Sequence, residues 1–588
     1  MAAAAACRSS ARRAVGFGGA WVIAPVSAAR DCEEDVGQRQ RGRWYALPPV
    51  IGLLPPCPAV RSCPSTTRCE SLAAGRKEVD DKVEASPPLP EGGSAFKRDV
   101  FILKNPASVH ADYAFDGFLG RGGFSSVLKA THKRTGIPRA VKKIAKSSTN
   151  RQQFESEVRA LISLDHPHIV KVIEYFEDQE NFYVITELCI GQDVFEYICG
   201  CNRLNNGASM SEREAAVILR QCLKAVSGCQ SQGFIHRDLK PENFMIMGKD
   251  NTVKLIDFGF ARRFRRGERY TEVVGTKAYM APEMLTGPCE YGRAVDIWSL
   301  GVMLFTMLTG EFLLPDGNEK EALQDAAYVA DRLRGCEKFR GLSEDARDLL
   351  TSMLRAEPRS RIKGVEALRH PFVQKYWHGS LAQEKLSNRY IDKDLPRKMR
   401  RFAESPLLRR VALLCLAHLA AASVLPPSLH DELLAARHTF RSLDDSGCGR
   451  VTEQQLRSRL EREGADVPED FSRTFALCTR TFSRESGGGG GGGVNGGEEG
   501  TAAALEYCAL VACILIDTQW PQFLLRETFN ILDRSRNGVI EVQDLLALAF
   551  DGAAPGASAA AAAIREVDPH VDGYINYDKF MSLMGVQQ

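Results

Sequence analysis

Apolar residues change their spacing at a few points along the chain of 588 residues, and these changes divide it into regions. Between about 112 and 373, short stretches with alternating apolar residues are interspersed with longer stretches in which they recur every three or four positions. The first pattern predicts strands and the second predicts amphipathic helices. From about 411 onward the helical pattern dominates, broken by short Asp/Gly loops. We therefore expect an α+β domain over 112–373, followed by an all-α region.

The remaining segments differ from this domain in composition. Residues 1–95 are rich in Pro, Ala, Ser and Arg without sustained periodicity, and we expect a disordered low-complexity extension there. Residues 379–425 are polar, then basic, then apolar, which predicts a linker and a junction helix. Residues 430–588 carry the Asp/Gly loops. The glycine run 487–493 and the alanine run 559–563 interrupt them, and both are interpreted as expanded surface loops.

Composition and charge exclude several classes of function. The formal net charge is +2, so no global field attracts nucleic acid. The 17 cysteines include no paired C-x-x-C clusters of the zinc type, and we expect a reducing, cytoplasmic location. No apolar stretch has the roughly 20 residues that a membrane-spanning helix needs. Ala2 stands where N-myristoylation requires glycine, which excludes this modification at this start site. The composition of residues 1–30 weakly resembles an organellar transit peptide, and alanine-rich low complexity explains it equally well.

Three early segments predict a phosphate-binding site. Residues 119–127 read LGRGGFSSV, where Gly120, Gly122 and Gly123 let backbone N–H groups approach phosphates. Residues 139–144 read RAVKKI, and the alternation places Lys142 on a strand. The amphipathic helix in FESEVRALISL carries Glu157, which can pair with a buried lysine.

Two further segments complete a pattern that resembles the eukaryotic protein kinase family: HRDLKPEN at 236–243 and DFG at 257–259. The resemblance implies a two-lobed fold that transfers the γ-phosphate of ATP to protein serine or threonine. It implies that Asp238 orients the substrate hydroxyl and accepts its proton, and that Lys240 reaches the γ-phosphate. Asn243 and Asp257 would hold Mg²⁺. The third glycine of the family pattern is replaced by Ser125.

The same resemblance locates the adenine pocket beside the segment FYVITELC. Thr186 takes the gatekeeper position. Backbone groups of Glu187 and Cys189 would bind the adenine edge, so that their side chains would not matter for binding. Val127 and Ala140 would cover the ring.

The activation segment departs from the family in a useful way. Glu272 stands where many kinases carry a phosphorylated residue, and its fixed charge can pair with Arg237. Glu283 is expected to pair with Arg361 as a structural contact.

Two acidic residues bear on the choice of substrate. Asp193 and Glu242 match positions that, in basophilic kinases, receive an arginine on the N-terminal side of the target serine. Surface acids are common, so a solvated acidic surface remains the alternative interpretation.

Three Asp/Gly loops, beginning at Asp444, Asp533 and Asp568, follow the EF-hand pattern. Kinase, basic junction and EF-hand lobe in this order resemble the calcium-dependent protein kinases of plants and protists. The resemblance covers about 110 to the C-terminus.

Several calcium-ligand positions of these loops carry residues that do not bind calcium well. An EF-hand needs oxygen ligands at positions 1, 3, 5 and 9 and a glutamate at position 12. The first loop has Cys448 at position 5 and Gln455 at position 12. Where the second loop is expected, the glycine run stands instead and no series of ligands remains. The fourth loop has Lys579 at position 12. The third is the candidate calcium site, with these ligands: Asp533, Ser535, Asn537, Glu541 and, in place of glutamate, Asp544.

Three functional hypotheses follow. The first is a kinase that an EF-hand lobe with weak or partial calcium binding controls, with Arg397–Arg410 acting as a pseudosubstrate against Asp193 and Glu242. The second is a kinase with a vestigial lobe that calcium does not control. The third is a pseudokinase scaffold, against which the intact Lys142 and Asp238 argue.

Overall fold

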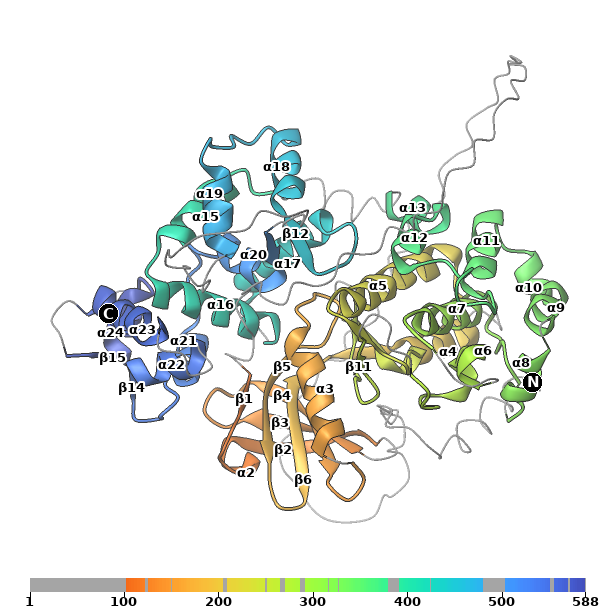
Figure 1. Ribbon diagram of the computed structural model, residues 1–588, viewed down its shortest axis with the longest axis horizontal. Coiled ribbons are helices and arrows are strands. Elements are labelled where there is room, and N and C mark those ends of the chain that lie inside the picture. The colour runs from red at the N-terminus through yellow and green to blue at the C-terminus, as the bar shows by residue number, and fades with distance from the viewer. Residues whose placement is uncertain are drawn as a thin grey trace, which may run out of the picture. The chain divides into compact units, whose positions relative to one another are not determined.

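The strands of the first lobe form one sheet. The computed structural model describes residues 102–121, 125–149, 151–204, 209–248, 251–264, 270–285, 291–378 without 316 and 326, 391–479 without 424, 503–549, 555–568 and 572–586. The sheet has the order β1-β5-β6-β4-β3-β2 (Figure 1). Its strands are β1 Leu103–Lys104, β2 Tyr113–Arg121, β3 Ser125–His132, β4 Pro138–Ala145, β5 Val172–Glu177 and β6 Asn181–Glu187. All neighbours are antiparallel except β1 and β5. Since β1 belongs to the sheet, the lobe begins before residue 112.

Two helices accompany this sheet: α2 Val109–Asp112 and α3 Arg151–Ser163. The apolar face of α3 is buried, and the ring of Phe154 stacks on Phe182 of β6 with centroids 4.0 Å apart. This contact fixes the rotation of α3 about its axis, and with it the direction in which Glu157 points.

The second lobe is mainly helical. Its helices are α4 Val194–Leu204, α5 Glu212–Ser231, α6 Pro282–Leu285, α7 Ala294–Thr309, α8 Glu319–Gln324, α9 Tyr328–Gly335, α10 Glu337–Arg340, α11 Glu344–Met353, α12 Gly364–Arg369 and α13 Pro371–His378, with 3₁₀ turns at Pro241–Asn243 and Lys277–Tyr279. Short strands accompany them: β7 Gly191–Asp193, β8 Phe234–Ile235, β9 Phe244–Met247, β10 Thr252–Leu255 and β11 Arg262–Arg263. Helix α5 starts with a reciprocal capping box between Ser211 and Glu214. Helix α7 is buried along its whole length and forms the centre of the lobe.

The C-terminal region consists of helix–loop–helix units. Its helices are α15 Leu395–Glu404, α16 Leu407–Ala421, α17 Pro427–Leu443, α18 Glu453–Arg462, α19 Phe471–Thr479, α20 Tyr507–Ile514, α21 Gln522–Leu532, α22 Val542–Ala549, α23 Pro555–Val567 and α24 Tyr577–Leu583. Short antiparallel strands join the loops in pairs: β12 Arg450–Thr452 with β13 Ala504–Glu506, and β14 Val539–Glu541 with β15 Tyr574–Asn576. Loop-to-loop pairing of this kind is what two EF-hand pairs require, and the predicted fold class is confirmed.

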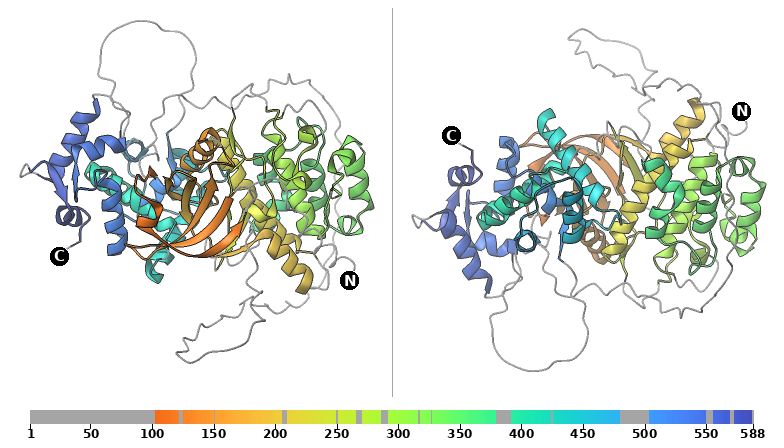
Figure 2. Two further views of the ribbon diagram at one scale, coloured as in Figure 1. Left: turned by 90° about the horizontal axis from the view of Figure 1, so that it is seen from below. Right: turned by 90° about the horizontal axis from the view of Figure 1, so that it is seen from above.

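Helix α16 joins the C-terminal region to the first lobe. Its residues are buried almost throughout, and one apolar core contains Leu416 of α16, Leu510 of α20, and Val141 and Ile185 of the sheet. Figure 2 shows α16 running alongside the sheet. The kinase-like domain and the C-terminal region therefore share a core and belong to one compact unit.

The alanine run 559–563 is not a surface loop: it lies within α23, with Ala560 and Ala563 buried, because alanine has the highest helix propensity. The glycine run and the extension 1–95 lie outside the described residues. Within the described part, no helix is long and apolar enough to cross a membrane.

Candidate active site

Lys142 stands at the centre of the predicted site. Strand β4 presents it toward α3 and the segment after β10, where its Nζ donates to Glu157 Oε1 at 2.6 Å and to Asp257 Oδ1 at 2.8 Å. All three side chains are buried. Burial alone would lower the pKa of Lys142, but the two carboxylates raise it above its ordinary value, so the ammonium keeps its charge. The structure thus brings together Lys142 and Glu157, as expected, and adds Asp257 directly.

Asp238 is held by groups on both of its carboxylate oxygens. Its Oδ1 accepts from the hydroxyl of Thr276 at 2.8 Å, and its Oδ2 lies 3.2 Å from Lys240 Nζ. Lys240 Nζ also donates to Thr276 Oγ1 at 2.8 Å, and Asn243 Nδ2 donates to the carbonyl oxygen of Asp238 at 2.7 Å. Sequence reasoning missed Thr276. The one signal for Thr276 in the sequence is that it follows Gly275. In the structure Gly275 has a φ of 109° and lies against the backbone of Arg237.

Two oxygens of this cluster are suited to Mg²⁺. Asn243 Oδ1 and Asp257 Oδ2 are buried and have no hydrogen-bond partner among the described residues. Buried polar atoms rarely remain without a partner, and amide and carboxylate oxygens are hard ligands. Within the described ranges, no three His, Cys, Asp or Glu side chains gather to hold a metal by themselves.

The backbone around Asp238 is constrained by Asp296. Its carboxylate accepts from the N–H groups of His236 and Arg237 at 3.0 and 2.9 Å. Arg237 has a φ of 70°, which is unusual for a residue with a side chain and persists only where its surroundings impose it. The two buried hydrogen bonds that the Asp296 carboxylate accepts provide that constraint.

The activation segment is attached to Arg237. The Arg237 guanidinium lies 3.0 Å from Glu272 Oε2 and donates to Tyr291 Oη at 3.1 Å. Arg237 is buried, whereas Glu272 is half exposed. Glu272 therefore supplies the negative charge without any modification.

A second ion pair stabilises the end of the activation segment. Arg361 donates to both carboxylate oxygens of Glu283 at 2.8 and 2.9 Å, and its guanidinium lies 5.2 Å from the ring centroid of Trp298. As expected, this pair lies away from Asp238 and makes contacts within the second lobe only.

The predicted adenine pocket is described in part. Gly120 lies near the end of β2, opposite Val127, and Val127 and Ala140 are buried; Gly122 and Gly123 lie outside the described residues. Burial raises the pKa of the Cys189 thiol, which is therefore neutral.

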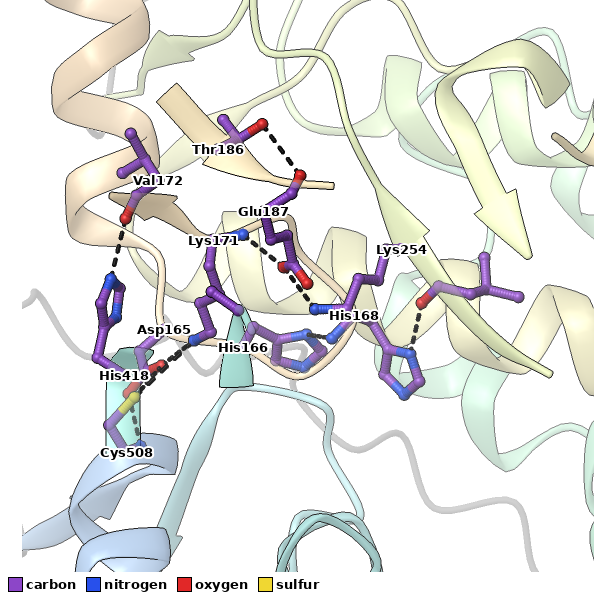
Figure 3. A network of polar contacts seen from close by, with 12 residues as sticks. Asp165, His166, His168, Lys171, Val172, Thr186, Glu187, Lys254, His418 and Cys508 are labelled. Carbon is purple, nitrogen blue, oxygen red and sulfur yellow. Dashed lines mark hydrogen bonds and ion pairs between the residues drawn. The ribbon is translucent and has the colours of Figure 1, made fainter. Parts of the chain in front are cut away.

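The Glu187 side chain makes buried contacts beside the predicted adenine pocket (Figure 3). It is buried, and its Oε1 accepts from the Lys254 ammonium at 2.6 Å and from the backbone N–H of Lys171 at 2.7 Å. These contacts hold the end of β6, the segment that the sequence predicts to line the adenine pocket.

Asp193 and Glu242 form an acidic pair. Glu242 Oε2 is buried without a hydrogen-bond partner among the described residues. Burial, together with the nearby charges of Glu196 and Glu242, raises the pKa of Asp193 to about 7. Burial likewise raises the pKa of Glu242. A cation that binds between these two carboxyl groups would favour their ionised form and so lower both pKa values.

The expected pseudosubstrate does not lie at this pair. Arg397, Arg400 and Arg401 instead pair with acids of the C-terminal region: Asp394 at 3.9 Å, Asp470, and Asp517 at 2.6 Å. The pseudosubstrate interpretation is therefore wrong for this conformation, because acids nearer in the fold neutralise the arginines.

The first and third EF-hand loops satisfy their own amides. Asp444 accepts from the N–H groups of Cys448 and Gly449 at 3.0 and 2.9 Å. In the third loop, Asp544 accepts from the N–H groups of Ser535 and Glu541, both at 2.8 Å. The candidate calcium ligands of the third loop thus share one loop, but Asp544 is turned toward amides.

The fourth loop carries its own cation. The Lys579 ammonium lies 3.0 Å from Asp568 Oδ2, 2.8 Å from Asp572 Oδ2 and 3.5 Å from the carbonyl oxygen of Tyr574. These residues occupy positions 1, 5 and 7 of an EF-hand loop, which are ligand positions for calcium. Lys579 therefore takes the place that the ion would occupy.

Replacing Lys579 by glutamate is expected to add one calcium site. The substitution removes the internal ammonium and supplies the missing carboxylate at position 12. Isothermal titration calorimetry with CaCl₂ up to about 1 mM should show the stoichiometry rise by one site. Lys579→Met is the control, since it removes the ammonium without adding an oxygen and should gain no site. An unchanged stoichiometry in Lys579→Glu would contradict the assignment of this loop.

Comparison with known proteins agrees with this geometry. Residues 113–373 match the model of the protein kinase domain. Calcium-dependent protein kinase 14 of Arabidopsis thaliana is 30% identical over 499 residues, covering 82% of this chain and 86% of that protein. Calcium-dependent protein kinase 15 of Oryza sativa subsp. japonica is 31% identical over 491 residues, covering 82% and 83%. Calcium-dependent protein kinase 5 of Plasmodium falciparum is 28% identical over 534 residues, covering 89% and 86%. The chain thus belongs to the calcium-dependent protein kinase family.

Proposed function

We propose that this serine/threonine kinase phosphorylates serines that have an arginine on their N-terminal side, and that its C-terminal lobe sustains the active arrangement of the first lobe. The observation that carries the catalytic part is the buried cluster of Lys142, Glu157 and Asp257, beside the unpartnered oxygens of Asn243 and Asp257. This arrangement matches an enzyme rather than a scaffold.

The residues divide the chemistry among themselves. Asp238 orients the substrate hydroxyl and accepts its proton, while Thr276 and Lys240 hold the carboxylate in place. Asn243 and Asp257 would hold Mg²⁺, which neutralises charge on the phosphates when it is bound with ATP. Lys142 contributes a positive charge that Glu157 positions from α3.

The support for basophilic substrates is the acidic pair. A guanidinium between Asp193 and Glu242 would satisfy the unpartnered Glu242 Oε2 and restore charge to both carboxyls. Protein substrates with basic residues near the target serine are therefore the proposed partners.

The support for regulation by the lobe is the buried Arg139 of β4, three residues before Lys142. Its Nη1 donates to the carbonyl oxygen of Ala422, just after α16, at 2.6 Å, and its Nη2 lies 3.4 Å from Glu527 Oε1 of α21. A fully buried guanidinium needs such partners, so β4 depends on the lobe for its position.

Calcium is a candidate ligand at the third loop only. The relatives are named calcium-dependent, whereas the ligand losses in this chain favour weak calcium binding or a lobe that calcium does not control.

Phosphorylation of an arginine-containing serine peptide with Mg-ATP, in calcium and in chelator, tests the proposal. Activity in both conditions is expected, with at most a severalfold gain in calcium. Activity in calcium alone would mean that the third loop gates the enzyme. Absence of activity in both would overturn the enzymatic proposal and favour the scaffold.

A further inference from the structure

The first EF-hand loop, Asp444–Gln455, lies on helix α5 of the kinase domain and binds it through main-chain carbonyl groups. Lys224 Nζ donates to the carbonyl oxygens of Arg441 at 3.0 Å and Asp444 at 2.6 Å. Ser227 Oγ donates to the carbonyl of Ser446 at 2.8 Å, and Ser231 Oγ to that of Cys448 at 2.9 Å. The three donors are spaced by three and four residues, so they line one face of α5.

The approach between loop and helix is close enough to require glycine. A Cβ on Gly447 would lie 2.8 Å from Lys224 Cα, and Gly447 has a φ of 67°. On the helix side, a Cβ on Gly228 would lie 3.1 Å from the ring of His166 and 3.6 Å from the carbonyl oxygen of Gly447. The surfaces are therefore complementary in shape as well as in hydrogen bonding.

The second EF-hand contacts the kinase domain through its exiting helix, α20 (Figure 3). Asp165 Oδ2 accepts from the backbone N–H of Cys508, the second residue of α20, at 2.7 Å. Asp165 Oδ1 accepts from the Cys508 thiol at 3.2 Å and pairs with Lys171. Glu506, the N-cap residue, makes no capping hydrogen bond with its own side chain. The kinase domain thus supplies the cap that α20 lacks.

Both contacts use the EF-hand pair whose calcium ligands are lost. Cys448 is the residue at position 5 of the first loop, and its carbonyl oxygen accepts a hydrogen bond from Ser231. No series of calcium ligands precedes α20 in the sequence. Lys224 is buried, and its amino group donates to the carbonyl oxygens of Arg441, near the end of α17, and of Asp444, the first residue of the loop. None of these interactions contains a group that calcium would have to order first.

We propose that the first EF-hand pair is a docking module for the kinase domain that works without calcium, its loop seated on α5 and its helix α20 capped by Asp165. Calcium-dependent change, where it occurs, is then confined to the second pair. The proposal stands independently of the catalytic roles, since it concerns attachment of the lobe.

The backbone amide of Cys508 reports this docking directly. An N–H at the second position of a helix has no acceptor within the helix, so Asp165 is the source of its protection from hydrogen exchange. Amides in the second turn of α20 bond within the helix and report folding of the lobe instead. Hydrogen exchange of the full-length protein, resolved to single amides by mass spectrometry, would be measured in 1 mM CaCl₂ and in EGTA.

We expect the protection of Cys508 to be equal within about twofold in the two conditions. It should fall at least tenfold in Lys224→Met/Ser227→Ala/Ser231→Ala, which removes the three donors, while the second turn of α20 stays protected. Gly447→Gln, which inserts a side chain against α5, should act alike; Gly464→Gln, at a glycine with a φ of 70° and open space around it, is the matched control. A tenfold loss of protection in EGTA, or no loss in either α5-contact variant, would overturn the proposal.

Discussion

Asp238→Asn is expected to lower kcat by about 10²–10⁴-fold, the range that a general base contributes, while ATP binding stays within a few-fold of wild type. Asparagine keeps the shape of the side chain and can still accept the Thr276 hydroxyl on its oxygen. It cannot accept a proton from the substrate, and its NH₂ group would face the Lys240 ammonium. Single-turnover phosphorylation of a serine peptide, with nucleotide affinity measured separately, separates the two effects.

Asp331→Asn is the matched control. This aspartate lies on α9 and is mostly exposed, so the same chemical change there should leave kcat unaltered. If Asp238→Asn retained kcat within threefold of wild type, Asp238 would not be the base, and the assignment of the whole catalytic loop would have to be revised.

The second large effect concerns the acidic pair. The double variant Asp193→Asn/Glu242→Gln is expected to lower kcat/KM for an arginine-containing serine peptide by about 100-fold, the loss of two charge-assisted hydrogen bonds. A peptide with alanine in place of that arginine should be a poor substrate of the wild type and be unaffected by the double variant. An equal loss with both peptides would show damage to the catalytic centre instead of lost recognition.

The pH dependence follows from the same residues. Burial raises the pKa of Asp193 to about 7, so in the free enzyme this carboxyl is charged at pH 8 and mostly neutral at pH 6. Arginine needs the charged form. The ratio of kcat/KM for the arginine peptide to that for the alanine peptide should therefore fall about tenfold between pH 8 and pH 6. In the double variant this ratio should be independent of pH, which separates the Asp193 titration from that of other groups.

The catalytic residues could be placed from the sequence because each stands in a short motif whose order along the chain is fixed by the chemistry. Lys142, Glu157 and Asp257 meet as that order implies. Thr276 and the side chain of Glu187 could not be placed this way. Their contacts join residues 38 and 67 positions apart, and a single threonine or glutamate in a loop carries no signal of its partner.

Charge complementarity alone also did not predict which acidic residues the basic junction contacts. The basic junction and the acidic pair have opposite charge, yet Arg401 pairs with Asp517, which no local pattern connects to it. The docking of the first EF-hand loop on α5 was equally hidden, because its acceptors are main-chain carbonyls, which every residue possesses.

The alanine run has a consequence for tolerated changes in chain length. A helix advances about 100° and 1.5 Å per residue, so one alanine more or fewer within 559–563 rotates Ile564 away from the core it now contacts when the residues before the run keep their places. The same shift would move Asp568, which begins the fourth loop opposite Lys579. An insertion that shifts the residues before the run puts alanine in place of alanine at 560 and 563, so the repeat can change length as long as the helix keeps its phase from Ile564 onward.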